Sequence, residues 1–347
     1  MVIEKEKSFF DFIKLVSPGM PLRTVVNDLV ESGLGAIIVF DSPELHEQNL
    51  FEGGFRINCR FTQQKLFELC KMDGGIIVST DLSRILYANV LMTPDNSLHT
   101  HETGTRHKAA ERIAKQAKTF VIAVSERKRK TTLYYSKTRY YLKTVDELIR
   151  GISSILQVLE KQREIFDDLL NNLNILEMSE LVSVSDVCKV IQRAEMILKI
   201  SDTIKKNFTE LGKEGSIMQM RYRELVRGIE KIENEVLRDY SIISLKKSTT
   251  LLSNLTYDGL LDIESISRLI IEKPLEESIS PKGFRFLSHL TLAEKEISQI
   301  VKQFGNLRNI LISDSSNFEN ILKGRASKMK EEILNLKEQV LSGKVVC

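Results

Sequence analysis

Short apolar runs alternate with helical patterns over the first 144 residues of the chain. At least five runs are rich in β-branched and aromatic residues and bounded by Gly, Asp, Ser or Pro, which is typical of strands. These runs are 34–40, 75–79, 85–88, 120–125 and 132–135. Helical patterns lie between them, notably over 62–71 and 104–118. The alternation predicts a mixed-sheet α/β domain over residues 1–144.

The pattern changes after Thr144. From Ile152 to Leu211 the chain has neither Gly nor Pro, and apolar residues recur at i, i+3, i+4 and i+7. The two clearest stripes are Ile152, Ile155, Leu156 and Leu159, and Phe166, Leu169, Leu170 and Leu173. This spacing predicts amphipathic helices packed as a bundle over 145–273, with a further helical stretch over 217–250. Ser183–Asp186 and Ser201–Asp202 resemble helix N-caps, so we expect them to divide the first run into separate helices.

A linker between Pro274 and Pro281 marks the start of a third unit, 274–347. Residues 281–347 contain 11 Lys and Arg against seven Asp and Glu, whereas residues 1–280 contain 39 against 40. The positive charge is therefore concentrated in the tail. A solvated helical surface explains this charge as well as a nucleic-acid contact does.

Composition narrows the class of protein. A chain of 347 residues with 42% apolar and 28% charged residues is an ordinary multidomain globular protein. The net charge of +3 is too small to make the whole chain a polyanion binder. Its four cysteines lack metal or redox spacing, and no apolar run approaches the length that spans a bilayer. We expect a reduced, cytoplasmic protein with no membrane segment.

A carboxylate followed by two glycines stands at the entrance of a predicted strand, in Asp73-Gly74-Gly75. Glycines let a ligand approach the backbone, and Asp73 can hold a divalent cation or accept a hydroxyl proton. An Asp-Gly pair is more often only a turn.

The segment 101–112 passes from turn residues into an Ala-rich helix. Backbone N–H groups at the helix start, together with Arg106, His107 and Lys108, can converge on an anion, which predicts a phosphate site. An ordinary capped helix with solvated cations is the alternative. Common nucleotide folds are disfavoured, because the chain has neither a P-loop nor a Rossmann glycine motif.

Taken together, the two segments lie about 30 residues apart and resemble the paired Asp-Gly-Ala and Arg-His-Arg motifs of diadenylate cyclases. Longer matching text surrounds them and resembles the DNA integrity scanning (DisA) family of these enzymes. The matching segments are 16–23, 53–58, 71–74, 85–89, 102–107 and 122–127.

The resemblance implies a diadenylate cyclase domain, a helical spine and a C-terminal helix-hairpin-helix-like domain. Such enzymes condense two ATP molecules into cyclic di-AMP and release two pyrophosphates across facing subunits, with Mg²⁺ or Mn²⁺. It also implies a homo-oligomer, an octamer in this family. Catalytic roles fall on Asp73, which also takes the metal, and on Arg106 and His107. The ATP-binding positions are Gly74, Gly75, Met92, Gly104, Thr105, Arg106, His107, Lys108, Ala109, Ser125 and Glu126.

Three positions depart from the family pattern in the cyclase domain. Gly75 replaces Ala, Lys108 replaces the second Arg, and Ala109 stands where Thr is usual. Lys108 keeps the charge but loses the planar fork that binds phosphate oxygens in pairs. We expect a slower synthase. The alternative is a DNA- or partner-binding scaffold that keeps nucleotide binding but not turnover.

The C-terminal unit departs further, because both expected hairpins are degraded. The first reads Leu290-Thr291-Leu292-Ala293, and the second, over 322–326, lacks one of its two usual glycines. The candidate DNA-binding residues are Lys323, Gly324, Arg325, Lys328 and Lys330. We expect weak, salt-sensitive binding of branched DNA. A purely structural helical cap is the alternative.

Overall fold

The computed structural model describes residues 9–322 and 324–343. The chain divides into two compact units. One comprises residues 1–152 with 206–217, and the other comprises 153–205 with 218–347.

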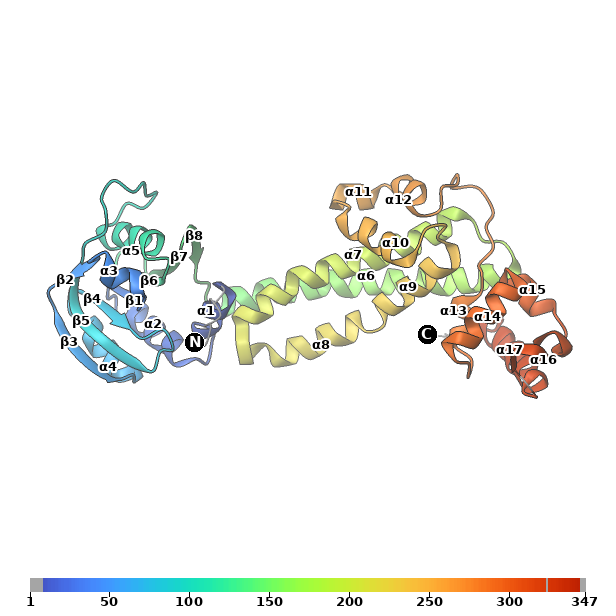
Figure 1. Ribbon diagram of the computed structural model, residues 1–347, viewed down its shortest axis with the longest axis horizontal. Coiled ribbons are helices and arrows are strands. Elements are labelled where there is room, and N and C mark those ends of the chain that lie inside the picture. Colours follow the sequence, from blue (N-terminus) through green and yellow to red (C-terminus); the bar gives the residue numbers. More distant parts are fainter. Residues whose placement is uncertain (1–8, 323, 344–347) are drawn as a thin grey trace. The chain divides into compact units, whose positions relative to one another are not determined.

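The first unit is built on an eight-stranded mixed sheet (Figure 1). Its strands run in the order β2-β5-β4-β1-β6-β7-β8, and β3 also pairs with β5. Only β1 and β4 are parallel, and the other pairs are antiparallel. The strands are β1 (Ala36–Phe40), β2 (Phe51–Glu52), β3 (Phe55–Arg60), β4 (Gly75–Val78), β5 (Arg84–Met92), β6 (Phe120–Ser125), β7 (Lys130–Tyr135) and β8 (Thr138–Tyr141).

Helices cover both faces of this sheet. Ile38 and Phe40 of β1 pack in one core with α1, α2 and α4, whereas Ile37 and Val39 pack in a second core with α3 and α5. The helices are α1 (Phe9–Leu15), α2 (Pro21–Glu31), α3 (Pro43–Glu47), α4 (Gln63–Cys70) and α5 (Thr105–Gln116). Burial on both faces explains why the central strands are continuously apolar rather than alternating.

All five predicted strands are confirmed, as β1, β4, β5, β6 and β7. The sequence did not indicate β2, β3 or β8. The residues of β3 and β8 are largely exposed or half-buried, and both strands lie away from the middle of the sheet. Strands of this kind carry little apolar signal, because their side chains do not have to be buried.

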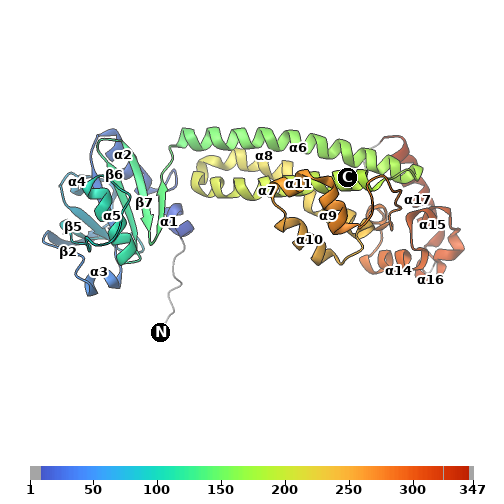
Figure 2. The ribbon, with the colours of Figure 1, turned by 90° about the horizontal axis from the view of Figure 1, so that it is seen from above.

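The helical region begins with two long helices, α6 (Val145–Ser179) and α7 (Val184–Leu211), which lie side by side in Figures 1 and 2. Most of the predicted stripes are buried, including Ile152, Leu159, Phe166 and Leu173. The mixed α/β and all-α fold class is thus confirmed.

One of the two predicted helix boundaries is wrong. Ser183 and Asp186 do cap α7, since the N–H of Asp186 donates to the Ser183 hydroxyl at 3.3 Å and the N–H of Ser183 donates to the Asp186 carboxylate at 3.2 Å. In contrast, Ser201 and Asp202 lie inside α7, which continues unbroken to Leu211. Ser201 is buried, and its hydroxyl lies 2.5 Å from that of Tyr222. A serine that finds such a partner is tolerated within a helix, so its presence does not mark an end.

The predicted stretch 217–250 forms three helices rather than one. They are α8 (Ser216–Val226), α9 (Ile229–Tyr240) and α10 (Leu245–Asn254), and α11 (Tyr257–Leu261) and α12 (Ile263–Ile270) follow. Gly228 separates α8 from α9 with a φ of +80°, a left-handed conformation that favours glycine.

The predicted linker 274–281 is hydrogen-bonded to the connection between α6 and α7. Val184 donates its N–H to the carbonyl of Glu277, and Ile279 donates to that of Val182, both at 3.0 Å. The helices that follow are α13 (Phe284–Ser288), α14 (Glu294–Phe304), α15 (Leu307–Ile312), α16 (Glu319–Leu322) and α17 (Ala326–Leu341). The division into 1–144, 145–273 and 274–347 stays a prediction.

A buried polar network joins α6, α9 and α13. Asp239 accepts the N–H groups of Gly283, Phe284 and Arg285 at 2.6–3.0 Å. The Arg285 guanidinium contacts the Glu177 carboxylate at 2.6 Å. Pairing of this kind is what lets charged groups remain in a core.

Among the described residues no helix is both long and apolar enough to cross a membrane.

Candidate active site

A cleft of about 450 Å³ opens where β4 begins, β5 ends and α5 begins. Seven of the predicted site residues line it: Asp73, Gly74, Gly75, Met92, Thr105, Arg106 and Ala109. The other lining residues are Ile37, Asn89, Val90 and Leu91. The two sequence motifs therefore meet at one cavity.

Arg106 bridges two carboxylates at this cleft. Its Nη2 lies 3.0 Å from Oδ1 of Asp73, and its Nη1 lies 3.8 Å from Oε2 of Glu126. The Asp73 side chain is fully exposed to solvent. Ion pairs in such wet surroundings contribute little to stability, so Arg106 can exchange these partners for phosphate oxygens at small cost.

Gly35 leaves the space that the Arg106 guanidinium occupies. A Cβ at position 35 would lie 2.6 Å from Nη1 of Arg106 and 3.4 Å from Cβ of Glu126. Gly35 lies within the predicted strand 34–40 and was not among the predicted site residues. Its part in the site follows from the tertiary structure, because the side chain of Arg106 from α5 packs directly against position 35.

The turn at Gly74 is held by Asn89, a second residue that the sequence analysis did not assign to the site. The Gly74 N–H donates to Oδ1 of Asn89 at 3.1 Å. A Cβ at Gly74 would lie 2.4 Å from the backbone carbon of Asn89, which itself has a φ of +56°. In the sequence, the one indication of a role for Asn89 was that it is the last residue of segment 85–89, which resembles the family.

The missing methyl group at Gly75 is compensated by neighbouring side chains. A Cβ there would lie 2.6 Å from Cε of Met92 and 2.9 Å from Cγ2 of Ile37. The space that alanine fills in the family pattern is therefore taken by these two side chains.

The start of α5 faces the same cleft. Gly104 is its N-cap residue and provides no side-chain cap, and Thr105 and Arg106 of the first turn line the cavity. Uncapped first-turn N–H groups and the helix dipole together favour an anion.

His107 is not among the residues that line the cleft, and its ring packs edge-on against Tyr134, with ring centroids 6.4 Å apart. Burial, more than any nearby charge, lowers the pKa of His107 and keeps its ring neutral near pH 7. Behind it, the Glu102 carboxylate accepts the Tyr134 hydroxyl at 2.6 Å and pairs with Arg139 at 2.9 Å. These contacts fix the segment that leads into α5.

Five predicted residues do not line the cleft: Gly104, His107, Lys108, Ser125 and Glu126. Glu126 still reaches Arg106, as described above. The Ser125 hydroxyl accepts the N–H of Lys128 at 3.2 Å, in the turn between β6 and β7. Lys108 is half-buried on α5 and has no ion pair within the described residues.

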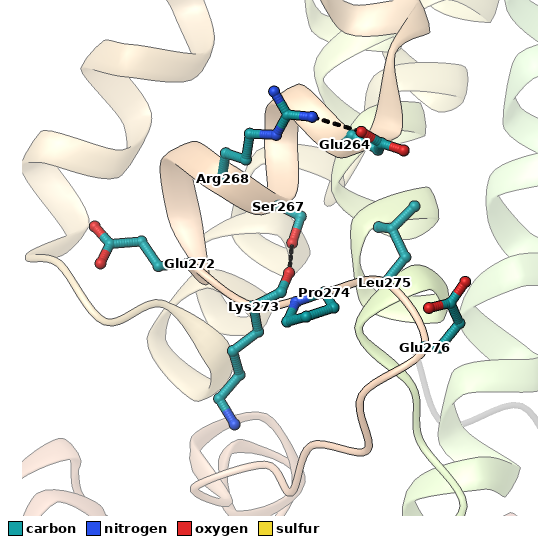
Figure 3. A pocket seen from close by; sticks show the side chains of 8 residues that line it. All are labelled: Glu264, Ser267, Arg268, Glu272, Lys273, Pro274, Leu275 and Glu276. Carbon is teal, nitrogen blue, oxygen red and sulfur yellow. Dashed lines mark hydrogen bonds and ion pairs between the residues drawn. The ribbon is translucent and has the colours of Figure 1, made fainter.

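A larger hollow of about 570 Å³ lies in the helical unit, beside α12 and the loop after it (Figure 3). Glu264 pairs there with Arg268 at 2.6 Å, and the Ser267 hydroxyl donates to the carbonyl of Lys273 at 2.5 Å. No predicted site residue lines this hollow.

Asp73 by itself is an incomplete metal site. In the part of the chain that the structure describes, no group of three or more His, Cys, Asp or Glu is placed to hold an ion. Mg²⁺ commonly binds one or two carboxylates and completes its shell with substrate phosphates and water. The exposed Asp73 carboxylate beside the uncapped start of α5 fits that kind of site.

The fold and the cleft define a nucleotide-binding α/β domain attached to an all-α region. Comparison with known proteins agrees: the model of the DisA bacterial checkpoint controller nucleotide-binding region matches residues 23–139, and that of the linker region matches 142–273. The DNA integrity scanning protein DisA of Clostridium botulinum (strain Loch Maree / Type A3) is 34% identical over 99% of this chain and 100% of its own. That of Clostridium kluyveri is 35% identical over 98% of this chain and 99% of its own.

The chain therefore belongs to the DisA family, and it is a diadenylate cyclase, a nucleotidyltransferase. Among solved structures, a double mutant of DacA from Staphylococcus aureus is 22% identical, with a TM-score of 0.32 over 36% of this chain and 85% of that one.

Proposed function

We propose that two copies of this chain condense two ATP molecules into cyclic di-AMP. Each 3′-hydroxyl oxygen attacks the α-phosphorus of the ATP held by the other copy, a new P–O bond forms, and the bond to pyrophosphate breaks. Two such steps close the ring and release two pyrophosphates. The observation that carries the proposal is the meeting of Asp73, Arg106 and the uncapped start of α5 at one cleft.

Each side chain has a distinct part in this reaction. Asp73 accepts the proton of the attacking hydroxyl, since its carboxylate is exposed at the mouth of the cleft. Arg106 turns from its carboxylate partners to the triphosphate, which the first-turn N–H groups of α5 and Lys108 also bind. The remaining predicted contacts to ATP are Gly74, Gly75, Met92, Gly104, Thr105, His107, Ala109, Ser125 and Glu126.

A divalent cation fits beside Asp73, with phosphate oxygens supplying its other ligands. When bound, Mg²⁺ or Mn²⁺ would lower the negative charge on the phosphates and favour ionisation of the hydroxyl. Asp73 would hold the ion in place, and Arg106 would stay free to bind phosphate.

Two ATP molecules have to meet in line, and one cleft positions only one of them. A facing copy supplies the second nucleotide at high effective concentration. We infer a homo-oligomer for this reason, and an octamer from the family resemblance.

Product analysis tests this proposal against the scaffold alternative. Purified protein incubated with ATP and Mn²⁺ is expected to yield cyclic di-AMP by chromatography, and Asp73→Asn is expected to yield none while still binding ATP. If wild type binds ATP and yields no product, the proposed synthesis is wrong, and the alternative of a scaffold that binds nucleotide without turnover is favoured.

We further propose that the C-terminal helices bind branched DNA weakly. Gly324 keeps a φ of +82°, as a hairpin that presents its backbone to phosphate requires, and Lys328 is exposed. However, the Gly324 N–H donates to Oε1 of Glu319 at 3.2 Å, and Arg325 pairs with Glu296. These carboxylates occupy groups that would otherwise contact DNA.

The remaining candidates add little to DNA affinity. Lys330 donates to the carbonyl of Leu311 at 2.7 Å, and burial lowers its pKa. Lys323 lies outside the described residues. A branched duplex titrated at 50 mM and 200 mM salt tests the proposal, and no binding at the lower concentration would refute it.

A further inference from the structure

A second cavity, of about 590 Å³, lies within the helical unit, and its volume is that of a small-molecule site. It is walled by α6, by the turn between α8 and α9, and by α13. No residue that lines it also lines the cyclase cleft.

Hydrogen-bond donors predominate around this cavity. The cationic or imidazole side chains that line it are Arg163, Arg227, Lys231, Arg285 and His289, and the acidic ones are Glu224 and Glu235. A ligand matched to such walls carries many acceptor oxygens and negative charge.

Two of the arginines are partly used by the protein. Nε of Arg163 donates to Asp167 at 2.9 Å, and its Nη1 donates to the carbonyl of Arg227, also at 2.9 Å. Arg285 contacts Asn174 and Glu177 through its terminal nitrogens. Its Nε, however, is buried without a hydrogen-bond partner. An orphaned donor of this kind is costly unless something binds it.

The other donors are less engaged. Arg227 is exposed and has no ion pair within residues 9–322 and 324–343. Nζ of Lys231 lies 3.7 Å from Oε1 of Glu235, and 74% of the Lys231 side chain is exposed. His289 is exposed beside Arg285, and its ring has no hydrogen bond within the described chain.

The start of α9 adds a further group of donors. Gly228 is its N-cap residue, has no side chain with which to cap the helix, and lines the cavity with Lys231 of the first turn. The dipole of this 12-residue helix therefore favours an anion at the same place.

We propose that this cavity binds a small phosphate-bearing anion. The ligand contacts the first turn of α9, Arg227 and Lys231 on one side, and Arg285 and His289 on the side of α13. Because these groups come from separate helices, the bound anion stabilises the packing of α13 against α6 and α9.

Calorimetric titration of the full chain with inorganic phosphate, and separately with pyrophosphate, tests this assignment. The variant R227Q/K231Q removes two exposed rim donors, so it is expected to fold and to keep its cyclase activity. Its affinity for the anion is expected to fall at least tenfold. Arg223→Gln, an exposed arginine on α8 that does not line the cavity, is the matched control and is expected to bind as wild type does.

Arg106→Gln distinguishes this cavity from the cyclase cleft. It is expected to weaken binding of the anion at the cleft and to leave binding at the cavity unchanged. With binding at the cleft weakened in this way, the anion is expected to raise the melting temperature of Arg106→Gln but not that of the same variant carrying R227Q/K231Q as well. Identical isotherms for wild type and R227Q/K231Q would overturn the proposal. The proposal would also be overturned if a short DNA duplex bound R227Q/K231Q more weakly than wild type while phosphate bound both equally.

Discussion

Nη2 of Arg106 lies 3.0 Å from Oδ1 of Asp73, although 33 positions separate the two residues in the chain. The pair joins the start of α5 to the turn before β4. In the proposed reaction Arg106 contacts the Asp73 carboxylate before ATP binds, and the triphosphate then competes for the same guanidinium. On this proposal one residue both orients Asp73 and binds the phosphates.

Arg106→Gln is expected to lower kcat/KM for ATP by about 100-fold, a loss of about 2.7 kcal/mol, because a planar cation is removed from the phosphates. Steady-state rates of cyclic di-AMP formation measure the effect. Arg60→Gln, at an exposed position of β3, is the control and is expected to leave the rate unchanged. A rate for Arg106→Gln within threefold of wild type would contradict the assigned role.

Gly35→Ala is expected to reduce activity by roughly tenfold without unfolding the domain. The added methyl group would lie 2.6 Å from Nη1 of Arg106, so the guanidinium has to leave its place between Asp73 and Glu126. Rate assays combined with thermal unfolding separate this effect from misfolding. Gly151→Ala, where a Cβ meets no other atom within 4 Å, is the control and is expected to be silent.

Two substitutions at Asn89 separate its hydrogen bond from its backbone conformation. Asn89→Gly keeps access to the φ of +56° but loses the bond to the Gly74 N–H, whereas Asn89→Ala loses both. Both are expected to lower kcat, with Ala destabilised by about 1 kcal/mol more than Gly. Wild-type kcat in Asn89→Gly would show that the side chain does not position the turn.

Stability is expected to fall as the pH rises through neutrality because of a buried pair of carboxylic acids. Glu195 of α7 and Glu233 of α9 are both buried, and burial, followed by the charge of Glu195, raises the pKa of Glu233 to about 9. The folded state therefore keeps a proton that the unfolded chain releases near pH 4.5. The free energy of unfolding decreases as the pH rises from about 4.5 to 9, because the unfolded state binds fewer protons in that range.

Glu233→Gln is expected to remove much of this dependence and to raise the free energy of unfolding at pH 8 by the order of 1 kcal/mol, since the amide needs no proton. Denaturant titrations at pH 5, 7 and 9 measure it. Glu276→Gln, at an exposed position whose charge is not among those acting on Glu233, is the control. Parallel pH profiles for wild type and Glu233→Gln would rule out the shared proton.

The sequence alone determined the central strands β1, β4 and β6, the long helices, and the two motifs that contain Asp73 and Arg106. These features are encoded by local periodicity and by residue type, which need no knowledge of distant neighbours. The weakly apolar strands β3 and β8 escaped detection, because exposed positions are not selected for burial. Ser201 was misread, because its partner Tyr222 comes from another helix.

Only the tertiary structure decided what Gly35, Asn89 and Glu233 do. Each has an ordinary local context, and its importance arises from a side chain or backbone that folding brings beside it from another element: Arg106, Gly74 and Glu195. Long-range contacts of this kind depend on strand register and helix packing, which sequence periodicity does not specify. The sequence therefore indicated the residues proposed to carry the chemistry of the cleft, but not the residues that position them.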